Sequence, residues 1–154
     1  MKKLISLVTG LLIYSTSLFA QEGNALADGQ VLNQDNQLYS GTHVTYHDNK
    51  NKEAIYLIEK GELNGQAQFF YEDGIKQEVG FYSNGEKHGK WMKWDKTGNM
   101  IGEVYFANGK KDGKWLIWDD NGQKRYEMYY IDGEKTGIWK IWNEDGKLIS
   151  KKNY

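Results

Sequence analysis

Residues 82–91 read Tyr-Ser-Asn-Gly-Glu-Lys-His-Gly-Lys-Trp, and residues 106–115 read Phe-Ala-Asn-Gly-Lys-Lys-Asp-Gly-Lys-Trp. A third version runs from Tyr130 to Trp139, so each version begins 24 residues after the one before it. The Asn-Gly and Asp-Gly pairs within these stretches tolerate positive φ, which tight hairpin turns require. The three stretches therefore predict a β-hairpin that is repeated along the chain.

Glycines recur at the same spacing through most of the sequence. Two further glycine series follow the 24-residue period, and together with the first they account for 13 of the 18 glycines. Such self-similarity indicates a repeat architecture. We take the first series as the leading, structural glycines of five units: Gly41, Gly65, Gly89, Gly113 and Gly137. The sequence thus predicts one repeat domain over residues 41–154, with units starting at 41, 65, 89, 113 and 137.

The segments between the turns have the length and composition of strands. Runs such as 90–95 and 100–107 are rich in aromatic and apolar residues. Turn dipeptides recur too often to leave room for an amphipathic helix. Successive strands joined by short turns must be antiparallel neighbours. We therefore predict an all-β fold, an elongated antiparallel meander of about nine to eleven strands, with two strands and two turns in each unit.

Aromatic residues follow the same period and form the candidate binding ladder. Stacked rings can bury apolar area in place of a globular core, or an exposed part can bind a peptide, a glycan or another protein. Tryptophans three residues apart lie on opposite faces of a regular strand, whereas a bulge would bring them together, and both arrangements stay open. The candidate residues are Trp91, Trp94, Trp115, Trp118, Trp139, Trp142, Tyr82, Phe106 and Tyr130.

The first forty residues differ from the repeat. Residues 1–20 combine basic Lys2 and Lys3, an apolar middle and a small-residue end at Ala20, as a signal peptide does. We expect an exported protein, periplasmic, at the cell surface or secreted, with no transmembrane span in the mature chain. Residues 21–40 are rich in Gln and Asn and are predicted to be a lead-in that caps the first unit, with one strand around Val31 and Leu32.

Little in the composition favours catalysis, metal binding or nucleic-acid binding. The chain has no cysteine, and removing the signal leaves 18 basic against 21 acidic residues, which gives no basic surplus for nucleic acid. Of its three histidines, His43 and His47 would lie about 13 Å apart along a strand, too far to share a metal. His88 falls in a predicted turn. No nucleophile elbow, phosphate loop or zinc-protease motif is present, so we predict no enzyme activity, no cofactor and no metal.

The quoted stretches resemble the MORN repeat, and in particular the bacterial MORN-repeat variant family. The resemblance covers residues 41–154 and is strongest in the last three units. It implies stacked β-hairpins that act as binding or scaffolding elements, and bacterial members are often labelled antitoxin components of toxin-antitoxin pairs.

These observations predict an exported, non-enzymatic binding or scaffold module whose partner is another protein. The surface around Trp91, Trp115 and Trp139 is the expected contact region. Two alternatives stay open. One is an antitoxin-like or immunity-type inhibitor of a toxin or an envelope enzyme, and the other is a surface glycan-binding protein.

Overall fold

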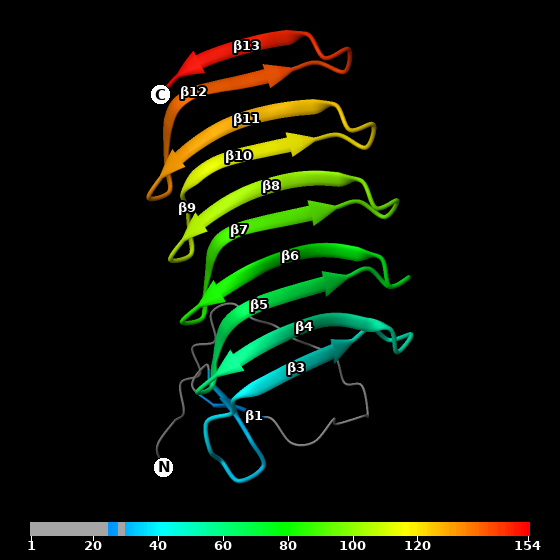
Figure 1. The fold of residues 1–154 in the computed structure, drawn as a ribbon, viewed down its shortest axis with the longest axis vertical. Coiled ribbons are helices and arrows are strands. Elements are labelled where there is room, and N and C mark those ends of the chain that lie inside the picture. Colours follow the sequence, from blue (N-terminus) through cyan, green and yellow to red (C-terminus); the bar gives the residue numbers. More distant parts are fainter. Residues whose placement is uncertain (1–24, 28–29) are drawn as a thin grey trace, which may run out of the picture.

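The computed structural model describes residues 25–27 and 30–154, and its main feature is one long, twisted antiparallel sheet (Figure 1). The described residues contain no helix. In this part of the chain, accordingly, no helix has the length and apolarity to cross a bilayer. The signal peptide predicted over residues 1–20 lies outside the described residues.

The strands follow one another across the sheet in chain order, from β3 at one edge to β13 at the other. Their bounds are β3 (Gly41–Tyr46), β4 (Lys52–Glu59), β5 (Glu62–Phe70), β6 (Lys76–Ser83), β7 (Glu86–Trp94), β8 (Met100–Ala107), β9 (Lys110–Lys111), β10 (Gly113–Trp118), β11 (Lys124–Ile131), β12 (Glu134–Trp142) and β13 (Leu148–Asn153). Short β9 pairs only with β8, and β9 and β10 together occupy the place of one strand interrupted at Asp112. The predicted antiparallel meander of 24-residue hairpins is confirmed.

One end of each hairpin is closed by a two-residue turn. Asn84 and Gly85 join β6 to β7, and both have positive φ, 49° and 79°. Asn108 and Gly109 do the same between β8 and β9. Positive φ at both central residues defines a type I′ turn, whose backbone twist matches the right-handed twist of the paired strands. The prediction made from the Asn-Gly pairs is therefore confirmed in its physical detail.

The other end of each hairpin carries a five-residue loop. In the loop between β7 and β8 only Gly98 has positive φ, and the Asp95 carboxylate accepts hydrogen bonds from the backbone N–H groups of Thr97 and Asn99. The register shifts by one residue where β8 begins, because Ile101 has no partner between Met100 and Gly102. A side-chain-stabilised turn followed by a bulge thus closes this end.

Three of the leading glycines lie inside strands and do not separate them as the predicted turn pattern required: Gly65, Gly89 and Gly137. The other two begin strands, Gly41 in β3 and Gly113 in β10. Gly89 lies inside β7, which begins at Glu86, so the predicted strand start at Lys90 and the turn position of His88 are wrong. Val79 pairs with Met92 and Phe81 with His88, which leaves Gly80 opposite three residues of β7. Gly89 has a φ of 68°. Glycine adopts this conformation without a Cβ clash, so the strand bends instead of ending.

In the last three units, the two tryptophans of each unit lie on opposite faces of the sheet. At the register shift between β7 and β8, the residue without a partner is Ile101 of β8. Side chains therefore alternate without interruption along β7 from Trp91 to Trp94. Of the two arrangements left open by the sequence, the structure has the one in which both faces of the sheet carry aromatic rings, and no bulge brings Trp91 and Trp94 to the same face.

Residues 30–40 make contact with the first hairpins. β1 (Ala25–Ala27) and β2 (Gln30–Leu32) form a separate two-stranded sheet, and β2 includes the expected Val31 and Leu32. The Val31 N–H donates to the Gly61 carbonyl, and the Gly61 N–H donates to the Tyr39 carbonyl. These bonds join the lead-in to the turn between β4 and β5. A capping role stays a prediction.

Candidate functional site: the two faces of the sheet

One face carries a continuous line of ring contacts, which we call the aromatic ladder. Neighbouring ring centroids lie between 4.7 Å, for Trp139 and Tyr154, and 6.5 Å, for His43 and Tyr56. The rings come from successive strands, so the ladder crosses the whole sheet. Its members are His43, Tyr56, Phe69, Tyr82, Trp91, Phe106, Trp115, Tyr130, Trp139 and Tyr154.

The indole N–H groups of the three ladder tryptophans donate hydrogen bonds within the protein. The indole N–H of Trp91 donates to the carbonyl of Phe81 at 3.1 Å. Trp115 and Trp139 make the same bond, at 3.0 Å, to the carbonyls of Tyr105 and Tyr129. Each donor thus already has a partner ten residues earlier in the chain.

Lysines cover the outer surface of the ladder. The Nζ atoms of Lys87, Lys111 and Lys135 lie 3.6, 4.6 and 4.7 Å from the ring centroids of Trp91, Trp115 and Trp139. An ammonium group over an indole face is attracted by the ring quadrupole. Trp91 is only 1% exposed and Tyr130 7%. Among the described residues no second layer packs on this sheet, and the ladder therefore serves as its hydrophobic core.

His43 and His47 do not lie on one strand as predicted, because β3 ends at Tyr46. His43 stacks on Tyr56 in the ladder, and burial lowers its pKa. His47 lies in a loop, where its Nε2 is 2.9 Å from the carbonyl oxygen of Phe70. Within residues 25–27 and 30–154, no group of three His, Cys, Asp or Glu side chains is arranged to hold a metal ion.

The opposite face carries a second aromatic series, which we call the outer row: Phe70, Trp94, Trp118 and Trp142. All four side chains are half-buried. Among the described residues they make no ring contact with one another, and the three indole N–H groups have no hydrogen-bond partner and are not buried. Each unit adds two strands, so neighbouring members are about 10 Å apart. Lys76 and Lys124 lie 5.7 and 4.5 Å from the ring centroids of Trp94 and Trp142. The indole N–H groups of the outer row nevertheless stay available to a partner.

Beside the outer row, charged side chains cross the sheet on the same face. Glu103 pairs across the strands with Met92 and Leu116, and Glu127 with Leu116 and Lys140. Lys90 lies 3.2 Å from Glu103, and the Tyr105 hydroxyl donates to that carboxylate at 3.4 Å. Lys114, Glu127 and Tyr129 repeat this group one unit later. This group was not predicted from the sequence, although its residues recur at the 24-residue spacing.

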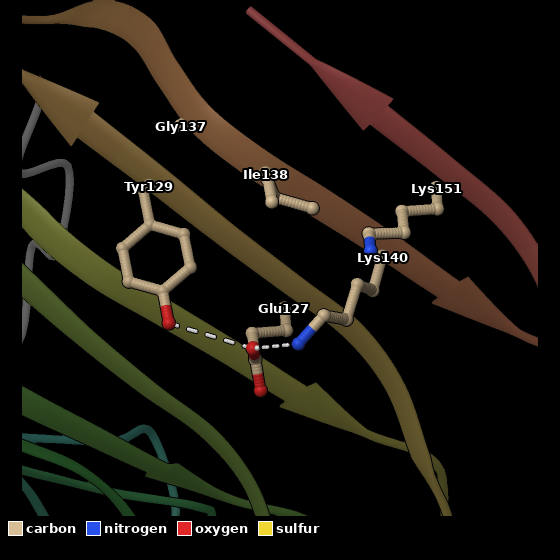
Figure 2. A pocket seen from close by; sticks show the side chains of 6 residues that line it. All are labelled: Glu127, Tyr129, Gly137, Ile138, Lys140 and Lys151. Carbon is tan, nitrogen blue, oxygen red and sulfur yellow. Dashed lines mark hydrogen bonds and ion pairs between the residues drawn. The ribbon is translucent and has the colours of Figure 1, made fainter.

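Glu127 is the most heavily paired charge on this face. Its carboxylate lies 3.0 Å from Lys140 Nζ, 3.1 Å from Lys124 Nζ and 3.8 Å from Lys114 Nζ, although its side chain is only 10% exposed. Figure 2 shows it beside a hollow formed with Tyr129, Gly137, Ile138, Lys140 and Lys151. Burial alone would raise the pKa of this carboxyl. The hydrogen bonds from Lys140 and Lys124 and the charge of Lys114 outweigh burial and lower the pKa to about 2 from an ordinary 4.5.

This pKa difference predicts a pH-dependent contribution of Glu127 to stability. Because the folded-state pKa lies below the unfolded one, the contribution is present above about pH 5 and is lost as the pH falls toward 2. We expect it to be about 2 kcal/mol, less than the full shift implies, because the lysines are partly exposed to solvent. Urea unfolding of wild type and Glu127→Gln between pH 7 and about pH 2 measures it, and the two stabilities should converge at low pH.

Glu103→Gln is the matched control, because Glu103 occupies the same place one unit earlier but pairs with a single lysine. A smaller loss is expected for this variant at neutral pH. Equal losses for the two variants would show that the lysine cluster adds nothing to the stability of Glu127.

Comparison with protein families agrees with this geometry. The pattern described as MORN repeat variant matches residues 63–84, 87–110, 111–132 and 135–154. The matches cover more than half of the chain, and the chain belongs to the MORN repeat variant family. Comparison with curated proteins gives no match. MORN repeats are generally binding modules, for proteins or membranes, rather than enzymes.

Proposed function

We propose that this chain is a non-catalytic protein-binding module that holds its partner on the face bearing the outer row, and that it works outside the cytoplasm. One observation carries the choice of face. The indole N–H groups of Trp91, Trp115 and Trp139 donate to backbone carbonyls, whereas those of Trp94, Trp118 and Trp142 have no acceptor among the described residues. Lysines lie near rings on both faces, so this difference in hydrogen bonding is what separates the two series. Aromatic side chains with free polar edges are frequent anchors in protein interfaces.

The expected contact region therefore moves from the Trp91, Trp115 and Trp139 series to the opposite face. The ladder tryptophans act in this proposal as the rigid support beneath the outer row, since a binding site on a stiff element keeps its geometry. Export is supported by the signal-like residues 1–20.

Site-specific photo-crosslinking tests the proposal. A photoreactive phenylalanine analogue placed at Trp118, on the outer-row face, should link to a partner in envelope extract of the source organism. The matched control is the same analogue at Tyr126, which pairs with Ile117 on the ladder face and is 40% exposed. We expect a specific product from position 118 and none from position 126.

Each result has a distinct meaning. Products from position 126 alone would place the binding surface on the ladder face, and products from neither position in the folded protein would contradict a binding function. The nature of a captured partner also separates the remaining alternatives. A toxin or an envelope enzyme would indicate an inhibitor, and a glycoprotein linked only through its sugars would indicate glycan binding.

A further inference from the structure

The outer-row face is rich in lysine although the chain as a whole has a formal net charge of -1. From β7 to β13, the residues that pair across this face include six lysines and four glutamates, Glu86, Glu103, Glu127 and Glu134. These lysines are Lys90, Lys110, Lys114, Lys124, Lys140 and Lys151. The positive charge is concentrated toward β13, since Lys114, Lys124 and Lys140 all share the single carboxylate of Glu127.

Two of these lysines oppose each other directly. Lys140 on β12 pairs with Lys151 on β13, and like charges at directly opposed positions destabilise a sheet. Lys140 reaches back to Glu127 at 3.0 Å. Lys151 is exposed and has no ion-pair partner among the described residues. The fold alone gives no reason for this pair, but a carboxylate placed between the two ammonium groups would turn repulsion into attraction.

The surroundings of the lysines are apolar. Gly137, Ile138 and Tyr129 line the hollow shared by Lys140 and Lys151, and Ile138 is 41% exposed (Figure 2). Leu148, 44% exposed, pairs with Trp142 of the outer row at the edge of the same face. Glu127 keeps its own negative charge in the middle of the cluster. This mixture of positive charge, one buried carboxylate and apolar side chains suits a ligand that presents single carboxylates beside apolar side chains better than one with a dense, uniform negative charge.

We infer that the partner of the outer-row face is an acidic protein segment, in which aspartate or glutamate side chains alternate with apolar ones. A carboxylate of this segment lies between Lys140 and Lys151, and its apolar side chains contact Ile138 and the tryptophans of the outer row. The inference rests on the proposed binding function and adds to it the chemistry of the partner.

Peptide binding to the purified protein tests the inference. The probes are synthetic peptides in which Glu alternates with Leu or Phe, together with the same peptides carrying Gln or Lys in place of Glu. We expect the acidic series to bind, with affinity that falls as salt increases, and the Gln and Lys series to bind more weakly by about tenfold or more.

Charge reversal at neighbouring positions supplies the control. Lys151→Glu should weaken binding of the acidic peptides by about tenfold. Lys152→Glu, one residue later, changes a lysine on the ladder face whose Nζ lies 4.5 Å from the ring centroid of Tyr154, and it should leave binding nearly unchanged. Neither lysine is ion-paired to a described residue, so both variants are expected to fold, which circular dichroism verifies.

The outcomes separate this inference from the proposed function. Equal effects of Lys151→Glu and Lys152→Glu, or equal binding of the Gln and Glu peptides, would overturn the inference of an acidic partner. The proposed binding function would still stand if Trp118→Ala abolished binding in the same assay. Binding of short heparin or of anionic lipid vesicles, without binding of the acidic peptides, would indicate a polyanion and also overturn the inference. If no peptide binds, the inference fails, and the crosslinking at position 118 decides independently whether the proposed function stands.

Discussion

Replacing Trp91 with alanine is expected to lower the free energy of unfolding by about 3–5 kcal/mol, the range found when buried tryptophan or phenylalanine is truncated. Trp91 is 1% exposed and contacts the rings of Phe69, Tyr82 and Phe106. Its loss removes the indole hydrogen bond to Phe81 and interrupts the aromatic ladder in the middle of the sheet. In a repeat protein each unit is stabilised mainly by its neighbours, so such a gap weakens the units on both sides.

Trp94→Ala is the matched control for this prediction. Trp94 lies on the same strand, three residues away, but on the opposite face and only half-buried. We expect a loss of roughly 1–2 kcal/mol from reduced apolar burial. Denaturation by urea, followed by far-ultraviolet circular dichroism, compares the two variants. A loss for Trp94→Ala as large as that for Trp91→Ala would contradict the assignment of the ladder as the core and the outer row as a surface.

The second large effect is expected at Gly80, where a single methyl group should destabilise the protein by about 2–3 kcal/mol. Gly80 is buried in β6 with ordinary backbone geometry, and a Cβ added there would overlap the indole carbons of Trp91. The corresponding residues of the following units are Val104 and Met128, and the tryptophans next to them are less deeply buried than Trp91. Because Gly80 has no side chain, the Trp91 ring can pack directly against it and become deeply buried.

Gly102→Ala provides the comparison. Gly102 is also a buried strand glycine without positive φ, but a Cβ there would come no closer than 3.6 Å to Lys93 Cβ, which is ordinary contact. This variant should be neutral or slightly stabilised, because alanine restricts the unfolded chain. Unfolding of Gly80→Ala in a Trp91→Phe background completes a double-mutant cycle. The smaller ring should relieve part of the overlap, and strictly additive losses would show that the two residues do not interact.

The repeat, its hairpins and its strand order were predictable from the sequence because they depend on local chemistry. Asn84-Gly85 and its counterparts form the expected turn since the two residues tolerate positive φ wherever they lie. Short turns leave antiparallel neighbours as the only arrangement, so the order of strands follows. Gly89 was misassigned because a glycine with positive φ can bend a strand as well as end it, and the residues around it do not distinguish the two.

The roles of the two tryptophan rows and the lysine cluster depended on the tertiary structure. The faces of Trp91 and Trp94 were settled by the position of the extra residue, Ile101, which belongs to the neighbouring strand. The environment of Glu127 brings together side chains from three strands up to 26 residues apart in the sequence. The 24-residue period thus determines which residues are equivalent. Burial, ring contact and charge pairing are set only when the strands lie side by side, because these interactions act between residues that are distant along the chain.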